Sequence, residues 1–137
     1  MTDLELMRLA EAARAFSYAP YSNFAVGAAL LTTGGKVYTG CNIESSSYTP
    51  TNCAERTAVF KAVSEGEKDF AAIAVIGAPV GEAGKFCAPC GVCRQVLREF
   101  CEPETFRVIL GSTEKTTAYT LQELLPTSFG PADLKGE

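Results

Sequence analysis

The sequence contains no histidine, and its lysines and arginines form no cluster. Without histidine, acid–base chemistry must use a carboxylate, Lys, Tyr or Cys, and a zinc site must use Cys, Asp or Glu. The chain has 12 basic and 16 acidic residues, a net charge of -4, and an isoelectric point of about 4.9. This balance argues against a nucleic-acid partner, which would need a basic surface for the phosphate backbone. It favours a small or neutral ligand.

Long apolar segments are also missing from the chain. No run approaches the length of a membrane span, and the residues after Met1 lack the charged and apolar regions of a signal peptide. We therefore expect a cytoplasmic protein with no membrane partner. The six cysteines should then be reduced, and their clustering indicates a metal site more than disulfide bonds.

The spacing of apolar residues predicts helices alternating with strands. Helices are expected over residues 3–17, over 53–64, between Pro89 and Pro103, and for a short stretch after Thr120; strands are expected at 24–32, 36–39, 70–76, 106–110 and 116–119. The tail from Thr127 is expected to be loose. With 137 residues and neither a repeat nor a linker, the chain is predicted to form a single domain over residues 1–137. The predicted fold class is α/β, a three-layer α/β/α domain whose mixed five-stranded sheet is covered by helices.

Three cysteines are expected at the starts of two different helices. Cys53 begins one helix, and Cys90 and Cys93 fall in the first turn of the next, so both of their sulfurs can point to one side. Helix N-termini carry partial positive charge, which favours thiolate over thiol. Arg56 is placed to hydrogen-bond the ligand sulfurs from behind. Three thiolates would hold one Zn²⁺ per chain and leave its fourth position for water, whose pKa zinc lowers to roughly 7.

Other metal sites use similar cysteine spacing. Cys87, Cys90 and Cys93 also read Cys-x-x-Cys-x-x-Cys, which hints at an iron–sulfur site, although the ferredoxin run would have cysteine where Leu97 stands. A closed structural zinc, in a module that binds a partner without catalysis, could add a fourth thiol to the set. The candidates for that fourth thiol are Cys41, Cys87 and Cys101. The sequence does not assign a role to Cys87.

The motifs Cys53-Ala54-Glu55 and Pro89-Cys90-Gly91-Val92-Cys93 match the zinc deaminase signature, in which His or Cys, any residue and Glu precede Pro-Cys-x-x-Cys. With Cys as the first ligand, the chain resembles the small, homotetrameric cytidine deaminases of free nucleosides. The resemblance extends over nearly the whole chain. It includes the strings Tyr18-Ala19-Pro20-Tyr21-Ser22, Phe24-Ala25-Val26-Gly27-Ala28-Ala29, Gly40-Cys41-Asn42-Ile43-Glu44, Cys93-Arg94-Gln95 and Leu124-Leu125-Pro126.

This resemblance implies hydrolytic deamination of cytidine and 2'-deoxycytidine in pyrimidine salvage. Glu55 would be the catalytic group, passing the water's proton to N3 and then a proton to the departing amine. The backbone N–H of Ala54 would bind the base O2, and the carbonyl of Ala88 would hold the amino group. Nothing in the sequence indicates which of the two nucleosides is preferred.

The resemblance also implies contacts to the sugar and between subunits. Asn42 and Glu44 would hydrogen-bond the ribose 3'-hydroxyl, and Phe24 would pack near base and sugar. Phe129 matches an aromatic residue supplied by a neighbouring subunit, so a homotetramer with shared active sites is expected. Tyr48 is a further interface candidate. A deaminase of nucleic acid is opposed by the acidic charge, whereas Asn42 and Glu44 favour a substrate that carries a sugar over a free base.

Overall fold

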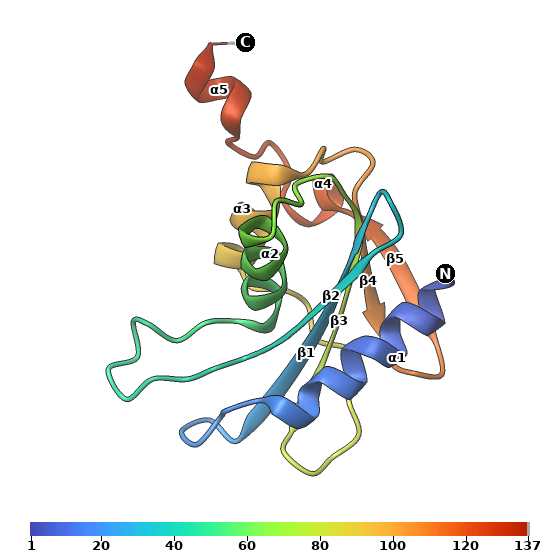
Figure 1. Cartoon of the computed structure of the whole chain (residues 1–137), viewed down its shortest axis with the longest axis vertical. Coiled ribbons are helices and arrows are strands. Elements are labelled where there is room, and N and C mark those ends of the chain that lie inside the picture. The colour runs from blue at the N-terminus through green and yellow to red at the C-terminus, as the bar shows by residue number, and fades with distance from the viewer. Residues whose placement is uncertain (137) are drawn as a thin grey trace.

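The central element of the structure, a computed structural model that describes residues 1–136, is a mixed sheet of five strands (Figure 1). The strands lie in the order β2-β1-β3-β4-β5. β1 pairs antiparallel with β2 and β3, β3 runs parallel to β4, and β4 pairs antiparallel with β5. In chain order the elements are α1 (Asp3–Ala13), a 3-10 turn (Arg14–Phe16), β1 (Phe24–Thr32), β2 (Val37–Cys41), α2 (Ala54–Ser64), β3 (Phe70–Pro79), α3 (Gly91–Phe100), β4 (Arg107–Gly111), β5 (Thr116–Thr120), α4 (Leu121–Leu124) and α5 (Pro131–Lys135). The predicted mixed five-stranded sheet is confirmed.

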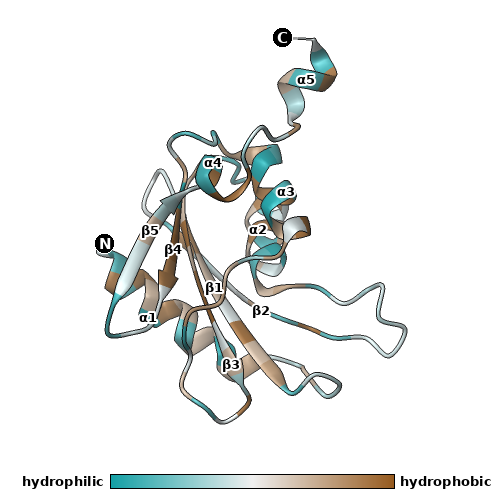
Figure 2. Ribbon diagram, turned by 180° about the vertical axis from the view of Figure 1, so that it is seen from behind, coloured by the Kyte–Doolittle hydropathy of each residue, from teal (hydrophilic) through white to brown (hydrophobic). Residues whose placement is uncertain are grey.

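Helices cover both faces of this sheet because alternate strand residues point in opposite directions. On one face, Leu30 and Ile73 pack in a core with residues of α2, α3 and α4. On the other face, Ala29 and Ile109 pack against α1. Figure 2 shows the interior strand β4 as hydrophobic and the edge strand β5 as much less so. The predicted three-layer α/β/α arrangement is therefore confirmed.

Two glycines allow the close approaches that the fold requires. Gly35, with φ of 93°, turns the chain between β1 and β2 in a conformation that other residues rarely adopt. Gly40 on β2 faces α2 so closely that a Cβ there would lie 2.4 Å from the carbonyl oxygen of Ala54 and 2.6 Å from the nitrogen of Ala58. The start of α2 therefore rests directly on the backbone of β2.

The ends of several elements differ from the expected bounds. The first helix is α-helical only to Ala13 and continues as a 3-10 turn, and β3 extends to Pro79 because its last residues pair with the start of β1. The expectation of a loose tail is wrong for α5. Asp133 accepts a hydrogen bond from the N–H of Gly130, and Pro131 begins the helix with a preset φ.

Figure 1 shows α5 extending away from the rest of the chain. Within the described residues, every helix is too short or too polar to cross a bilayer.

Candidate metal centre and active site

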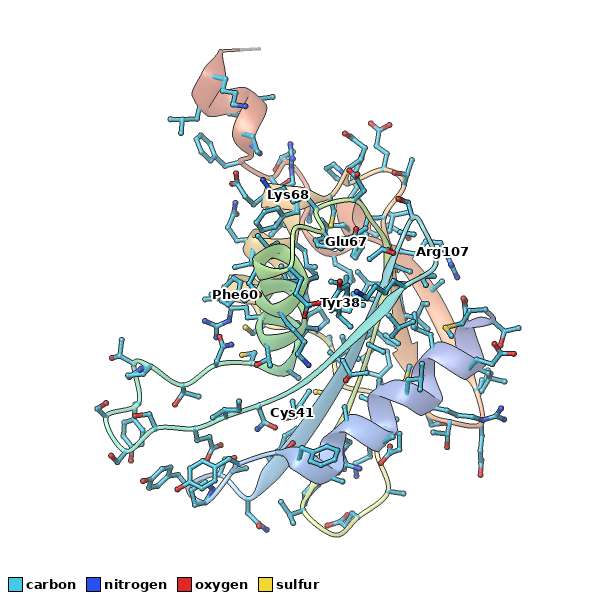
Figure 3. The ribbon with its side chains drawn as sticks, in the orientation of Figure 1. Tyr38, Cys41, Phe60, Glu67, Lys68 and Arg107 are labelled. Carbon is cyan, nitrogen blue, oxygen red and sulfur yellow. The ribbon has the colours of Figure 1, made fainter. Side chains whose placement is uncertain are left out.

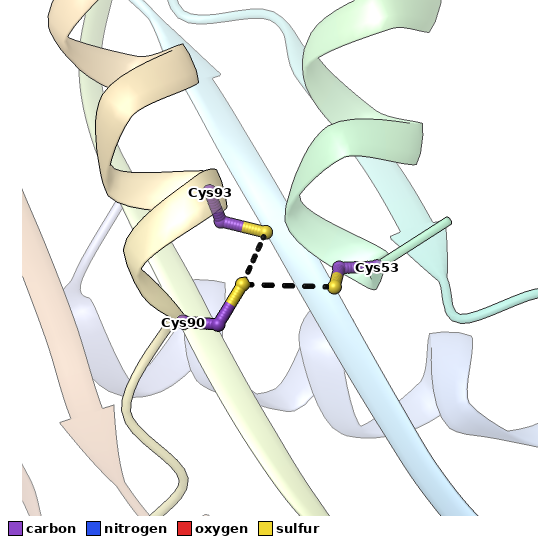
Figure 4. A group of neighbouring side chains, drawn as sticks. All are labelled: Cys53, Cys90 and Cys93. Carbon is purple, nitrogen blue, oxygen red and sulfur yellow. Dashed lines mark hydrogen bonds between the residues drawn. The ribbon is translucent and has the colours of Figure 1, made fainter. Parts of the chain in front are cut away.

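The starts of α2 and α3 bring three cysteine side chains together. Cys53 is the N-cap residue of α2, Cys90 is the N-cap residue of α3, and Cys93 lies in the first turn of α3. Neither N-cap side chain makes a capping hydrogen bond with the backbone of its own helix, so both sulfurs are free to face the gap between the helices. Figure 4 shows the three sulfurs turned toward one another.

The separations of the sulfurs fit a tetrahedral zinc site. The Sγ atom of Cys90 lies 3.9 Å from that of Cys53 and 3.5 Å from that of Cys93, and all three lie within 4.8 Å of one another. A tetrahedral ion with Zn–S bonds of about 2.3 Å needs sulfurs about 3.8 Å apart. Thiolates are also the ligands that zinc prefers in such sites. The residues therefore fit a zinc ion held by three sulfurs.

The surroundings of the thiols favour negative charge on sulfur. The Cys93 thiol and Arg56 both hydrogen-bond Cys53 and lower the pKa of its thiol to about 5. The Nη2 atom of Arg56 lies 3.2 Å from the Cys53 sulfur. Although burial opposes the charge on Arg56, hydrogen bonds to Cys53 and Cys93 hold its pKa above the usual value. Its buried Nε finds no hydrogen-bond partner among the described residues. Arg56 thus stands beside the three thiols.

Glu55 projects from the first turn of α2 into a cavity of about 200 Å³. Its side chain is only 4% exposed. Burial raises the pKa of its carboxyl, although hydrogen bonds from its own backbone and from Cys93 favour the charged form. A raised pKa brings a carboxyl group closer to the range in which it can both accept and donate a proton. The group of three thiols does not include Glu55, so its carboxylate stays available beside them.

The walls of this cavity contain many of the predicted residues. Asn42, Ala54 and Ala88 all line it, together with the Cys87 side chain. The cavity is also lined by Val26, Thr51, Asn52, Cys53, Glu55 and Cys90. Sequence reasoning missed Val26, Thr51 and Asn52, because a strand valine and two residues of a polar loop carry no separate signal.

Asn42 and Glu44 are anchored to the backbone around the start of β1. Asn42 accepts a hydrogen bond from the N–H of Val26 at 2.9 Å and donates one to the carbonyl of Phe24 at 2.8 Å. The carboxylate of Glu44 accepts hydrogen bonds from the backbone N–H groups of Tyr21 and Ser22 and from the Ser22 hydroxyl. These bonds, led by that of the hydroxyl, lower the pKa of Glu44. Both side chains are therefore held in fixed positions.

Glu44 does not line the same cavity as Glu55. It lines a neighbouring hollow of about 420 Å³ with Tyr21, Ser22 and Tyr48, and Thr51 belongs to both. Thr51 is therefore a wall that the two hollows share.

The two predicted aromatic contacts are not among the cavity walls. Phe24 begins β1, and its ring and the Cys87 sulfur both approach within about 3.0 Å of the position a Cβ would take on Gly77. Phe129 is 60% exposed, and its carbonyl accepts a hydrogen bond from Gln95 of α3. A role for Phe129 in the active site of a neighbouring subunit remains a prediction.

The remaining cysteines do not join the metal centre. Among the residues described, the one group of potential ligands consists of Cys53, Cys90 and Cys93. Cys87 stands apart from it, and burial raises the pKa of its thiol. Cys41 and Cys101 are buried, and burial raises the pKa of Cys101 to about 12. This arrangement gives no support to the iron–sulfur site or to a zinc closed by a fourth thiol.

Comparisons with known proteins agree with this site. Residues 1–110 match the family described as "Cytidine and deoxycytidylate deaminase zinc-binding region". The cytidine deaminase of Sporosarcina psychrophila is 47% identical over 133 residues, covering 95% of this chain and 93% of the relative. That of Halalkalibacterium halodurans is 48% identical over 130 residues, covering 94% and 95%.

Solved structures are similar as well. The crystal structure of cytidine deaminase from Burkholderia pseudomallei is 48% identical, with a TM-score of 0.84, and the match covers 94% of this chain and all of that one. The enzyme from Mycobacterium tuberculosis is 37% identical with a TM-score of 0.76, covering 93% and 96%. Because the family match spans residues 1–110 and these relatives and structures match nearly the whole chain, the chain belongs to the zinc-binding cytidine and deoxycytidylate deaminase family of hydrolytic enzymes.

Proposed function

We propose that the chain hydrolyses cytidine and 2'-deoxycytidine to uridine and 2'-deoxyuridine with release of ammonia, in pyrimidine salvage. The observation that carries the proposal is the buried carboxyl of Glu55 beside three converging thiols in one cavity. The two nucleosides are proposed together because nothing in the sequence indicates which of them is preferred. The names of the similar proteins support the cytidine assignment.

The activity is proposed to depend on one zinc ion per chain, held by Cys53, Cys90 and Cys93. When bound, the ion lowers the pKa of a water molecule to roughly 7 and so supplies a nucleophile at neutral pH. Arg56, 3.2 Å from the Cys53 sulfur, offsets part of the charge of three thiolates around a divalent ion. The positive end of each helix acts in the same direction.

Glu55 is proposed to move the protons of the reaction. Addition of water at C4 of the base becomes easier when N3 is protonated, and departure of the amine requires a further proton. One group can serve both steps if it accepts a proton from water and donates it again. The raised pKa of the buried Glu55 carboxyl suits this exchange.

The cavity walls are proposed to hold the base. Ala54 and Ala88 are small, so their backbone groups can approach a planar ring closely. The N–H of Ala54, at the first position of α2, is one of the helix-start groups that have no partner within the helix. It would donate to the base O2, and the carbonyl of Ala88 would accept from the exocyclic amine.

The adjoining hollow around Glu44 is proposed to hold the sugar. Asn42 and Glu44 would bind the 3'-hydroxyl through hydrogen-bonding sites that their contacts within the chain leave free. A carboxylate such as that of Glu44 can accept about four hydrogen bonds. A 3'-phosphate would be repelled by Glu44, whose lowered pKa keeps it charged. Phe24, at the start of β1, would contact the base and sugar together.

A homotetramer with shared active sites is proposed as the assembly. Several aromatic side chains are exposed in the isolated chain, including Phe129, Tyr48 and Phe60. Figure 3 shows Phe60 on α2, on the side turned away from Tyr38 and the sheet. Burial of such side chains between subunits is typical of obligate oligomers. The six free cysteines fit a reducing compartment, and the cytoplasm is proposed.

The proposal is tested by assaying purified protein against cytidine, deoxycytidine, cytosine and CMP while zinc is measured on the same sample. We expect ultraviolet absorbance to fall with both nucleosides and one zinc per chain to be found. Turnover of neither nucleoside, with zinc present, would contradict the proposal and favour a non-catalytic zinc module. Efficient turnover of cytosine would instead assign the free base as substrate.

A further inference from the structure

A buried arginine outside the cavity ties together three parts of the chain. Arg14 follows α1, and its residue is only 8% exposed. Its Nε donates to the carbonyl of Ala25 at 2.7 Å, and Nη2 donates to the carbonyls of Ala78 at 3.0 Å and Pro79 at 3.4 Å. Nη1 donates to the carbonyl of Glu82 at 3.0 Å. One side chain thus joins the start of β1, the end of β3 and the segment that follows.

The guanidinium of Arg14 has no donor left for a ligand. Nη1 also donates to the carboxylate of Glu11 at 2.6 Å, which brings the total to five hydrogen bonds for the five N–H groups that arginine carries. The hollow of about 520 Å³ beside Arg14 therefore offers no free positive group to an anion. The role of Arg14 must therefore lie in the backbone segments that its hydrogen bonds hold together.

Glu11 extends the same arrangement to the segment after β3. Its second carboxylate oxygen accepts a hydrogen bond from the N–H of Gly84 at 3.1 Å. The contact is so close that a Cβ on Gly84 would lie 2.1 Å from this oxygen. Gly27 on β1 makes room for the last part of α1, since a Cβ there would lie 1.9 Å from the carbonyl oxygen of Ala10 and 2.9 Å from Cγ of Arg14. Gly84 thus makes space for Glu11, and Gly27 makes space for the helix end that carries Arg14.

The segment held by this pair leads directly to the metal centre. Immediately after Gly84, Lys85 exchanges two backbone hydrogen bonds with Gly77 of β3. The next residues include Cys87 and Ala88, which line the cavity with Glu55, and then Cys90. Because Gly84 and Ala88 are so close in sequence, a displacement of Gly84 is transmitted over a short length of chain.

We propose that Glu11 and Arg14 are positioning residues, which hold residues 82–88 so that the carbonyl of Ala88 meets the substrate's amino group. This inference rests on the proposed function, since it assigns Ala88 to the base. Neither residue touches substrate. The pair acts through the backbone, and a lysine cannot replace Arg14 because an ammonium group lacks the planar set of five donors.

The test compares Arg14→Lys and Gly84→Ala with the wild type. For both variants we expect kcat/KM for cytidine to fall about 10- to 100-fold, the range for a displaced binding group. The fall should come mainly through KM, because the contact with the amino group exists before the chemical step. Zinc should stay at one per chain, and hydrogen exchange at the backbone amides of positions 84 and 85 should become faster.

Two matched controls separate positioning from general loss of stability. Arg107→Lys alters another arginine that pairs with α1, through Asp3, but no residue of the 82–88 segment. Val108→Ala removes volume from the fully buried part of β4 and should lower the melting temperature. Both controls should keep the wild-type KM and the wild-type exchange at positions 84 and 85.

A double variant adds a stricter condition. Glu11→Ala removes the carboxylate that the added methyl group of Gly84→Ala would meet. The two substitutions combined should therefore raise KM by less than the product of the single effects. Wild-type KM in both Arg14→Lys and Gly84→Ala would overturn the proposal, as would a raised KM with unchanged exchange. If the wild type deaminates neither nucleoside, the proposed function fails, and the exchange rates still decide whether the pair holds the segment.

Discussion

Glu55 and Glu44 are the same residue type in opposite environments, at two adjoining hollows that share Thr51. Glu55 is buried, and its pKa is raised by that burial. Glu44 is partly exposed and accepts hydrogen bonds from a hydroxyl and two backbone N–H groups, which lower its pKa. The first environment suits a group that exchanges protons, and the second suits a permanent acceptor. The comparison places the proposed proton transfer at Glu55 and the proposed substrate recognition at Glu44.

The largest effect on this comparison is expected when a proposed metal ligand beside Glu55 is removed. We expect Cys90→Ala to lose zinc and to lower turnover by more than about 10⁴-fold, because the ion supplies the nucleophile. Metal analysis and the cytidine assay measure the two effects on one sample. Cys101→Ala is the matched control, since Cys101 is buried outside the thiol group, and it should keep both zinc and activity.

Glu55→Gln tests the proton-transfer side without removing the metal. The amide has the size of the carboxyl but cannot accept and return a proton, so kcat should fall about 10²- to 10⁴-fold, the usual contribution of acid–base catalysis. Zinc content should stay at one per chain. A near-normal kcat in this variant would remove Glu55 from the mechanism.

Glu44→Gln tests the recognition side and should have a smaller effect of a different kind. We expect KM for cytidine to rise about tenfold, the cost of weakening a hydrogen bond to a charged group, with kcat much less affected. Steady-state kinetics on cytidine measure both values. The comparison between the two glutamates would fail if Glu44→Gln reduced kcat and left KM unchanged.

The smallest expected effect concerns the exposed Phe129, which lines neither hollow of its own chain. If a neighbouring subunit contributes this ring, Phe129→Ala should weaken kcat/KM about 3- to 10-fold, near the value of one aromatic contact. Sedimentation of the variant shows whether the tetramer persists. The exposed residue Leu134 provides a control, because Leu134→Ala removes an apolar group from α5 without changing the ring.

The group of three thiols was predictable in part from local signals. Cys90 and Cys93 are three residues apart at a helix start, and Cys53 stands two residues before Glu55, so helix geometry relates the two members of each pair. The zinc deaminase signature supported joining the two pairs in one site. The continuous apolar runs likewise predicted the interior strands β3 and β4. The position of Asn42 next to the cavity followed from the family resemblance.

The backbone contacts of the Glu11–Arg14 pair could not be predicted in the same way. Apart from Glu11, the partners of Arg14 are backbone carbonyls as far as 68 residues away along the chain. Every residue carries such a carbonyl, so the sequence does not mark the ones that Arg14 binds. The helix at Pro131 was missed for another reason. Its capping contact, between Gly130 and Asp133, lacks the Ser or Thr that usually marks a helix start.

The contact between Gly40 and the start of α2 has a consequence for how this sequence can change over evolution. A methyl group at position 40 would push against the carbonyl of Ala54, between Cys53 and Glu55. Metal affinity and proton transfer would then suffer together from a substitution on a strand that supplies neither function. We therefore expect natural variation at this position to be restricted as narrowly as at the ligands themselves.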